Sequence, residues 1–161
     1  MSTIKDFRYS VQASRLPRRR VRLTGTGKPA LEAATPPEFR GGTPGMWSPE
    51  DLLVASVASC YSLTLDAIAK QRDIPIHGLS VEGVGHVTRR AEGRIGFVVI
   101  ELLVELAVEP GFEEAARRVA HSAKRSCLVG HALEIPIELE LCVRSDAAPT
   151  VAQLAHAGSL G

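Results

Sequence analysis

The hydrophobic and polar positions of the first half of the chain follow two periods, one typical of strands and one typical of a helix. Residues 5–24 alternate apolar and polar side chains, which predicts a strand. A glycine-containing turn over residues 24–28 then leads to a second strand around residues 30–34, completing a hairpin. After a loop rich in proline and glycine, residues 49–72 carry apolar side chains at helical spacing, and Ser48 is a suitable N-cap. We therefore expect a hairpin followed by one long helix.

The second half of the chain predicts two long strands, a helix and a last strand. The strands should cover residues 77–89 and 94–108 with a tight turn between them, and the following helix should run to about Lys124. The last strand turns its apolar residues 135–143 inward at every second position and leaves Cys142 on the opposite, polar face. Mixed helices and strands with hairpin connections indicate an α+β fold with antiparallel sheets.

The long helix over residues 49–72 is unusual because it is apolar on most of its sides. A helix with this pattern is normally buried on most sides. In a small domain, that burial requires cover from a sheet and also from a second subunit. The pattern therefore predicts contact between this helix and a partner copy.

The length of 161 residues predicts a single domain over 1–161, with a core over about 5–144 and a weakly structured tail over 145–161. The net charge is +1, so no large basic surface indicates nucleic acid or an anionic membrane as partner. The arginine-rich run 18–22 is the local exception. It is either a solvated strand or hairpin, or a source of a guanidinium group for an active site.

The sequence shows no targeting signal. No stretch reaches the roughly 18 apolar residues needed to span a bilayer, and residues 1–6 lack the apolar core of a signal peptide. We therefore expect a cytoplasmic protein without a membrane partner. In a reducing compartment, its three cysteines should be free, catalytic or redox-cycling. They form no CxxC motif, and the histidines form no zinc-ligand pattern, so we expect no metal.

Two cysteines, Cys60 and Cys127, are the candidates for chemistry. A free cysteine in an apolar helix is commonly an inert core residue, and that interpretation stays open for both. If the two thiols meet, a thiolate at one can attack an oxidant, and the resulting sulfenic acid can condense with the other to a disulfide. That reaction needs a lowered pKa at the first sulfur. His131 either sits near Cys127 or is a surface or capping residue.

Three segments carry a resemblance to known proteins: the loop Pro37-Glu38-Phe39-Arg40-Gly41-Gly42, the run Ser48-Pro49-Glu50-Asp51-Leu52-Leu53 followed by Ala58-Ser59-Cys60, and Cys127-Leu128-Val129. Together they resemble the OsmC/Ohr superfamily of osmotically inducible and organic hydroperoxide resistance proteins. Leu128 occupies a position where the family usually has proline. The run around Glu50 is more similar to the general OsmC-like branch than to the branch specialised for organic hydroperoxides.

The resemblance implies a thiol-dependent peroxidase that works without a metal or organic cofactor. Cys60 would be the peroxidatic cysteine, Cys127 the resolving one, and Glu50 would hold an arginine that activates Cys60. The fold would be antiparallel sheets wrapped around a long central helix, in an intertwined homodimer with active sites at the interface. The substrate would be a peroxide, and lipoylated proteins or other dithiols would reduce the disulfide.

Helix geometry adds a constraint to this assignment. On one continuous helix, Glu50 and Cys60 would be about 15 Å apart, too far for an ion pair that acts on Cys60. We therefore predict that Glu50 reaches the Cys60 of the other subunit, unless the helix begins after Glu50. For the arginine we favour Arg20, then Arg22, because strand alternation places both on one face with Arg18 and puts Arg19 on the other. Arg40 is a further candidate.

Two other classes of function remain open beside the peroxidase. A non-enzymatic ligand-binding protein could use a dimer-interface cavity with the thiols incidental, and a non-catalytic stress protein could be kept for stability or partner binding. Replacing Cys127 separates these cases, because only a two-cysteine peroxidase loses turnover while its first oxidation survives.

Overall fold

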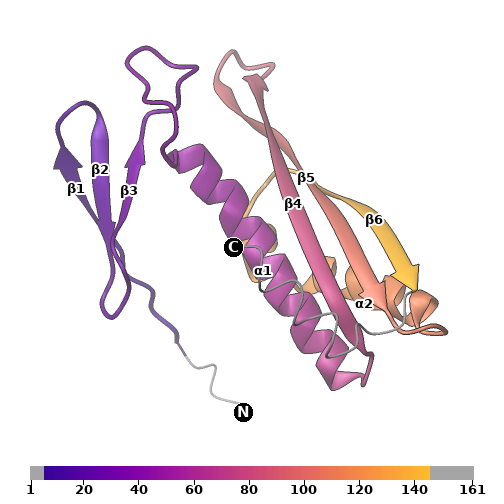
Figure 1. Cartoon of the computed structure of the whole chain (residues 1–161). Helices are drawn as coiled ribbons and strands as arrows, with labels where there is room; N and C mark the ends of the chain where they lie inside the picture. The colour runs from indigo at the N-terminus through magenta and orange to yellow at the C-terminus, as the bar shows by residue number, and fades with distance from the viewer. Residues whose placement is uncertain (1–5, 146–161) are drawn as a thin grey trace. The chain divides into compact units, whose positions relative to one another are not determined.

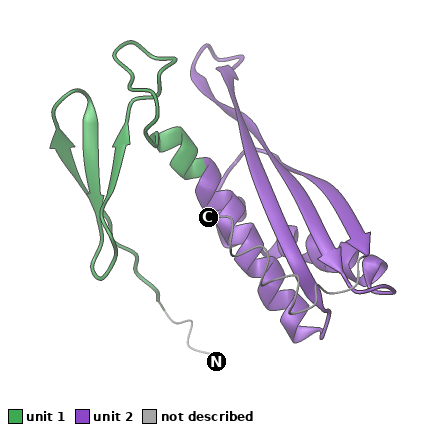
Figure 2. Cartoon of the chain, in the orientation of Figure 1, with its two compact units in different colours: residues 1–53 green, residues 54–161 purple. Residues whose placement is uncertain are grey.

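The computed structural model describes residues 6–145, and the chain divides into two compact units, residues 1–53 and 54–161 (Figure 2). Each unit carries one three-stranded sheet, so the fold is α+β, as predicted. The tail expected over 145–161 lies outside the described residues except for Ser145, which ends the last strand.

The first unit contains three antiparallel strands, β1 (Gln12–Leu16), β2 (Arg20–Thr24) and β3 (Leu31–Ala34), in that order across the sheet (Figure 1). The prediction of one strand over residues 5–24 is therefore wrong. A turn between β1 and β2 interrupts it, and Arg18 and Arg19 adopt φ values of 59° and 55° there. Glycine or asparagine usually marks such backbone conformations, and arginine does not.

Helix α1 (Pro49–Gln71) begins where the sequence predicts. The Ser48 hydroxyl accepts a hydrogen bond from the Asp51 backbone N–H at 3.0 Å. In return, the Asp51 carboxylate accepts bonds at 2.8 Å from the backbone N–H and the hydroxyl of Ser48. This reciprocal arrangement is a capping box, which satisfies backbone donors that a helix start leaves free. The local sequence therefore fixes the first turn of α1.

The second unit contains β4 (Ile76–Arg89) and β5 (Ile95–Val108), which form a long antiparallel hairpin as predicted. The last strand, β6 (Ile137–Ser145), pairs with β5 in parallel, so the expectation of a purely antiparallel sheet is wrong here. The helices α2 (Glu113–Ser126) and α3 (Leu128–His131) supply the crossover that a parallel neighbour requires (Figure 1).

The core of the second unit lies between α1, the sheet and α2. One stripe of α1 is fully buried, and its residues recur every four positions: Val57, Tyr61, Leu65 and Ala69. They pack in one cluster with alternate residues of β5 and with the small residues of α2. Leu63 faces away from this stripe and is 71% exposed. A single chain therefore buries α1 on one side, and cover from a partner subunit remains a prediction.

Helix α1 also meets the length and composition criteria for a membrane-spanning helix. Its 23 residues include an 18-residue window of mean hydropathy 1.7. The sequence prediction that no stretch is apolar enough to span a bilayer did not single out α1. One stripe of α1 is buried in the core of the second unit, and a core helix can have the same length and composition.

Candidate active site

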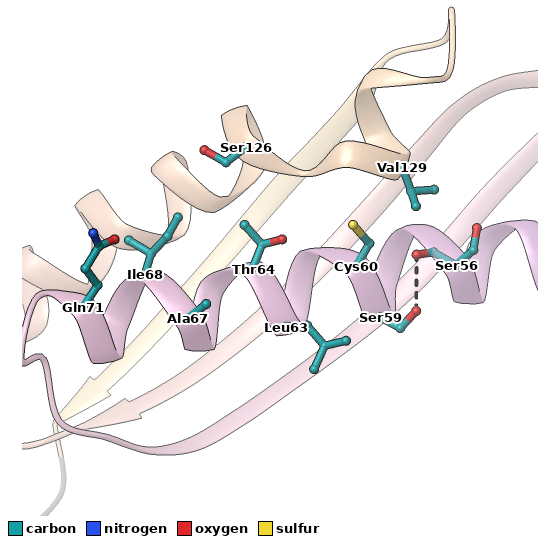
Figure 3. A pocket seen from close by; sticks show the side chains of 10 residues that line it. All are labelled: Ser56, Ser59, Cys60, Leu63, Thr64, Ala67, Ile68, Gln71, Ser126 and Val129. Atoms are coloured by element: carbon teal, nitrogen blue, oxygen red, sulfur yellow. Dashed lines mark hydrogen bonds between the residues drawn. The ribbon is translucent and has the colours of Figure 1, made fainter. Parts of the chain in front are cut away.

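Cys60 and Cys127 reach the same place from two different elements. Cys60 lies in the middle of α1 and is half-buried, and its Sγ points toward the segment that carries Val129 (Figure 3). Cys127 is buried at the junction where α2 ends and α3 begins. Its backbone is extended, with φ −69° and ψ 106°, and its Sγ accepts a hydrogen bond from the Gly130 N–H at 3.4 Å. Cys127 therefore caps the end of α2 and the start of α3.

The surroundings of Cys60 lower the pKa of its thiol. Burial opposes ionisation, but hydrogen bonds to the sulfur outweigh it. The donors are, in order of effect, the backbone N–H of Val129, the thiol of Cys127, the hydroxyl of Thr64 and the backbone N–H of Leu128. A lowered pKa increases the fraction of thiolate, which is the nucleophilic form.

The thiol of Cys127 is shifted the other way. Burial raises its pKa and outweighs the hydrogen bond from Gly130, and the neighbouring Cys60 sulfur raises it further. The two thiols therefore interact directly, and the Cys60 thiol ionises at a lower pH than the Cys127 thiol. This arrangement fits one cysteine that attacks as a thiolate and a second that waits as a thiol.

An open pocket of about 650 Å³ adjoins Cys60. Apolar side chains, including Leu63, Ile68 and Val129, form part of its wall, and the hydroxyl groups of Ser59 and Thr64 form another part (Figure 3). Its volume is in the range of small-molecule sites. A ligand with an apolar part and a polar end suits this lining. Among residues 6–145, no group of three or more His, Cys, Asp or Glu residues could hold a metal ion.

Glu50 lies in a separate cavity of about 370 Å³ in the first unit, and Arg19 lines the same cavity. The Glu50 Oε2 atom is buried and has no hydrogen-bond partner among residues 6–145. The guanidinium of Arg19 donates instead to the backbone carbonyl of Arg40. A buried carboxylate oxygen without a donor is costly. This cavity therefore has a place for a cationic donor at Glu50.

The favoured arginines have another partner. Arg20 lies 3.6 Å from Glu32 Oε2, and Arg22 donates to Glu32 Oε1 at 2.8 Å, so both face one carboxylate on β3. Their shared face was predicted, whereas their pairing with Glu32 was not. Strand alternation placed Arg19 on the other face, so Arg20 and Arg22 were preferred to it. Arg19 lies in the turn between β1 and β2, where strand alternation does not apply.

His131 takes the capping role that sequence analysis left open. Its Nε2 atom donates to the backbone carbonyl of Arg125 in the last turn of α2. It also lines a small cavity that Cys127 borders, so proximity to Cys127 holds as well. Cys142 is exposed on β6 and lies on the polar face of that strand, as predicted.

The comparisons with known proteins agree on one family. The family model described as OsmC-like protein matches residues 42–141, more than half of the chain. An OsmC-like protein of unknown function from Vibrio cholerae superposes with a TM-score of 0.78 at 15% identity, covering 85% of this chain and 100% of that one. An organic hydroperoxide resistance protein from Elizabethkingia anophelis, solved with thiocyanate bound, gives a TM-score of 0.68 at 22% identity, covering 91% and 100%.

A third solved structure, the organic hydroperoxide resistance protein OhrB of Bacillus subtilis, gives a TM-score of 0.64 at 22% identity, covering 86% of this chain and 98% of that one. No curated protein sequence matches the chain. At these identities the solved structures show a shared fold, and the family model supplies the assignment. Because that model matches more than half of its residues, this chain belongs to the OsmC-like protein family.

Proposed function

We propose that this protein is a thiol-dependent peroxidase that reduces organic hydroperoxides through Cys60 and Cys127. The observation that carries the proposal is the meeting of two thiols with opposite pKa shifts, of which Cys60 lines an open, largely apolar pocket. An inert core cysteine has no need of four hydrogen-bond donors. Membership of a family that includes proteins named for hydroperoxide resistance supports the same chemistry.

The reaction divides into three balanced steps. The Cys60 thiolate attacks the terminal oxygen of the hydroperoxide, the O–O bond breaks, and the leaving alkoxide takes a proton to become an alcohol. Cys60 is now a sulfenic acid, and the Cys127 thiol attacks its sulfur, forms the disulfide and releases water. A dithiol then reduces the disulfide and is itself oxidised to a disulfide. We place this cycle in a reducing compartment, consistent with the expected cytoplasmic location.

Glu50 and an arginine complete the proposed site. A guanidinium beside Cys60 would stabilise the thiolate and orient the peroxide, and Glu50 would hold that guanidinium. Arg20 is the residue favoured from the sequence, and Arg19 is the better candidate on geometry because it lines the Glu50 cavity. The unpaired Glu50 Oε2 supports a partner that arrives on assembly or on substrate binding.

We also propose that the working form is a homodimer. The helix is continuous from Pro49 to Gln71, so it does not begin after Glu50. Ten residues of helix separate Glu50 from Cys60 by about 15 Å. Glu50 therefore acts on the Cys60 of the partner subunit in this proposal. The exposed apolar Leu63 on α1 is consistent with cover by a second chain.

The test follows intact mass after one equivalent of cumene hydroperoxide. The wild-type protein should lose two hydrogens, mapped to a disulfide between Cys60 and Cys127. The Cys127→Ser variant should gain one oxygen at Cys60, trapped by dimedone, and should lose turnover with a dithiol. The Cys142→Ser variant is the matched control and should behave as wild type, since Cys142 is exposed on another face.

A ligand-binding protein is the alternative, and the apolar pocket beside Cys60 is the observation that favours it. Under that hypothesis, cumene hydroperoxide leaves all three thiols free. Both cysteine variants then keep the affinity of the wild type for an apolar ligand. Thiols that remain free after oxidant would therefore overturn the peroxidase proposal.

A further inference from the structure

Cys127 borders a second cavity that does not include Cys60. This cavity has a volume of about 180 Å³, and its wall includes Tyr61, Lys124, Cys127, Gly130, His131 and Ile137. The larger pocket beside Cys60 is lined by other residues, and Cys127 is absent from that lining. The two sulfurs meet each other, yet each borders a different cavity.

We propose that the cavity beside Cys127 is the entry for the reducing dithiol, whose thiolate attacks the Cys127 sulfur of the disulfide. This inference rests on the proposed peroxidase cycle and adds the place and the direction of its last step. The peroxide and the reductant then approach from different cavities. Cys60 meets the oxidant and Cys127 meets the reductant.

The geometry of thiol–disulfide exchange favours this direction. An attacking thiolate approaches a disulfide along the line of the S–S bond, from the side opposite the leaving sulfur. A thiolate that attacks Cys127 must therefore arrive on the side away from Cys60. The small cavity borders Cys127 without bordering Cys60, so a thiolate that enters it meets Cys127 and not Cys60.

The leaving group gives a second argument. Exchange is faster when the departing thiol has the lower pKa. The hydrogen bonds at Cys60 lower its pKa, whereas burial raises that of Cys127. Attack at Cys127 releases the better leaving group, and attack at Cys60 would release the poorer one.

The lining of the cavity suits an anion. Lys124 is exposed at the end of α2 and carries a positive charge, and His131 lies on α3. The reacting form of the reductant is a thiolate, and a nearby ammonium group attracts it. The cavity is too small for a whole protein and admits a slender end, such as the dithiol of an extended cofactor arm.

The step balances without any other reagent. One thiolate of the dithiol bonds to Cys127 Sγ, the Cys60–Cys127 bond breaks, and Cys60 leaves as a thiolate. The second thiol of the reductant then attacks the reductant sulfur that is bonded to Cys127. This closes a cyclic disulfide within the reductant and releases Cys127 as a thiol. The protein gains two electrons and the dithiol loses two.

The first test identifies the sulfur that is attacked. The oxidised protein, prepared with diamide so that no peroxidase step is needed, reacts with thioglycolate and is quenched with N-ethylmaleimide. Peptide mass should find thioglycolate on Cys127 and maleimide on Cys60. Thioglycolate found on Cys60 would overturn the proposal.

The second test narrows the cavity. A Cβ at Gly130 would lie 3.4 Å from the Cys127 Sγ and 3.8 Å from Ile137, so Gly130→Ala adds a methyl group beside the sulfur without a severe clash. Reduction of its disulfide by dihydrolipoamide should slow about tenfold. Ala132→Val, in the same segment but outside both cavities, is the control and should keep the wild-type rate. Equal rates in all three proteins would contradict the proposal.

The third test changes the charge. Lys124→Met should slow reduction by thioglycolate about three- to fivefold, the effect of one unit charge at a few ångströms in water. Lys124→Arg should restore the rate. Mercaptoethanol, whose reacting thiolate carries one negative charge where thioglycolate carries two, should be slowed less by Lys124→Met. Equal loss with both probes would contradict the steering role.

The two proposals can fail separately. If hydroperoxide does not form the disulfide but diamide does, the peroxidase proposal fails while the mapping experiment still shows which sulfur a thiolate attacks. If hydroperoxide forms the disulfide and the adduct maps to Cys60, the peroxidase proposal holds and the entry through the Cys127 cavity fails.

Discussion

At the scale of single residues, burial and hydrogen bonds have opposite effects on the pKa of the Cys60 thiol, and the hydrogen bonds prevail. Burial alone would keep this thiol protonated and inert, as in most core cysteines. Donors from α1 and from the segment after Cys127 reverse that outcome and lower its pKa. Reactivity at Cys60 is therefore a property of packing between two elements.

This balance predicts a pH effect when one donor is removed. In Thr64→Val the hydroxyl that donates to Cys60 is lost while the shape of the side chain is nearly kept. A hydrogen bond to a charged group contributes about 1.5–3 kcal/mol, so the midpoint for thiolate formation should rise by about one to two pH units. Below that midpoint, alkylation of Cys60 by iodoacetamide should be slower at each pH, as peptide-resolved mass spectrometry can show.

Ser62→Ala is the control for this prediction. It also removes a hydroxyl from α1, but Ser62 donates to the Ala58 carbonyl at 2.8 Å and is no donor to Cys60. Its alkylation profile should match the wild type. An unchanged midpoint in Thr64→Val would show that the remaining donors, the Cys127 thiol and the backbone of Leu128 and Val129, set the reactivity of Cys60.

The residues of the site could be predicted from the sequence in unequal measure. The motifs around Cys60 and Cys127 identify both cysteines, and the structure brings these two together. The arginine could not be chosen, because the choice depended on strand alternation through Arg18 and Arg19. Both residues adopt left-handed backbone conformations in a turn, which no glycine or asparagine signals.

At the scale of elements, two glycines let α1 lie close against β4. A Cβ at Gly83 would be 2.7 Å from Val54 Cγ1, and a Cβ at Gly85 would be 2.5 Å from the Phe97 ring and 2.7 Å from Val54 Cγ2. Carbon atoms do not approach so closely, so either side chain would push the helix and strand apart. Because Cys60 lies on the same helix, these glycines help to set its position.

We therefore expect Gly83→Ala and Gly85→Ala each to lower the free energy of unfolding by about 1–3 kcal/mol, the usual cost of overpacking. Urea unfolding with an unchanged slope would measure the change. Gly25→Ala is the control, because its Cβ would lie 3.4 Å from the flexible Lys28 side chain and 3.6 Å from the Ser10 carbonyl oxygen, which is ordinary van der Waals contact. Adding Val54→Ala to Gly83→Ala should recover part of the loss, and simple additivity of the two changes would argue against this contact.

Most elements of the second unit could be predicted, because long periodic segments carry a strong signal. The hairpin of β4 and β5 and the helix α2 follow from hydrophobic spacing and turn residues. The parallel pairing of β6 with β5 could not be predicted in this way. Alternation of side chains is the same in parallel and antiparallel strands, and only the path of α2 and α3 decides the direction.

At the scale of the whole molecule, two of the features that the described residues leave without a partner bear on assembly. The buried Glu50 Oε2 lacks a donor, and the apolar Leu63 of α1 is 71% exposed. The buried Glu50 oxygen costs free energy until a cation binds to it, and the exposed Leu63 side chain costs free energy until apolar surface covers it. A symmetric dimer would satisfy both with a single interface.

The dimer proposal predicts that two defective subunits can repair each other. Glu50→Gln removes the carboxylate and Cys60→Ser removes the reactive thiol, so each variant alone should lose hydroperoxide turnover. If Glu50 acts across the interface, a mixed dimer combines the intact Cys60 of one chain with the intact Glu50 of the other. Random exchange of equal amounts puts half of the chains into mixed dimers with one working site each, so about a quarter of wild-type activity should return.

The outcome depends on whether Glu50 acts on the Cys60 of its own chain or of the partner chain. Because the helix between the two residues is continuous, one Glu50 cannot do both. If Glu50 served the Cys60 of its own chain, no chain in the mixture would carry both residues, and activity would stay at the level of the separate variants. Mixing Glu50→Gln with Cys127→Ser gives a second check, since those dimers also regain one complete site only when Glu50 acts across the interface. Failure of both mixtures, with exchange of subunits confirmed by native mass spectrometry, would rule out the shared site.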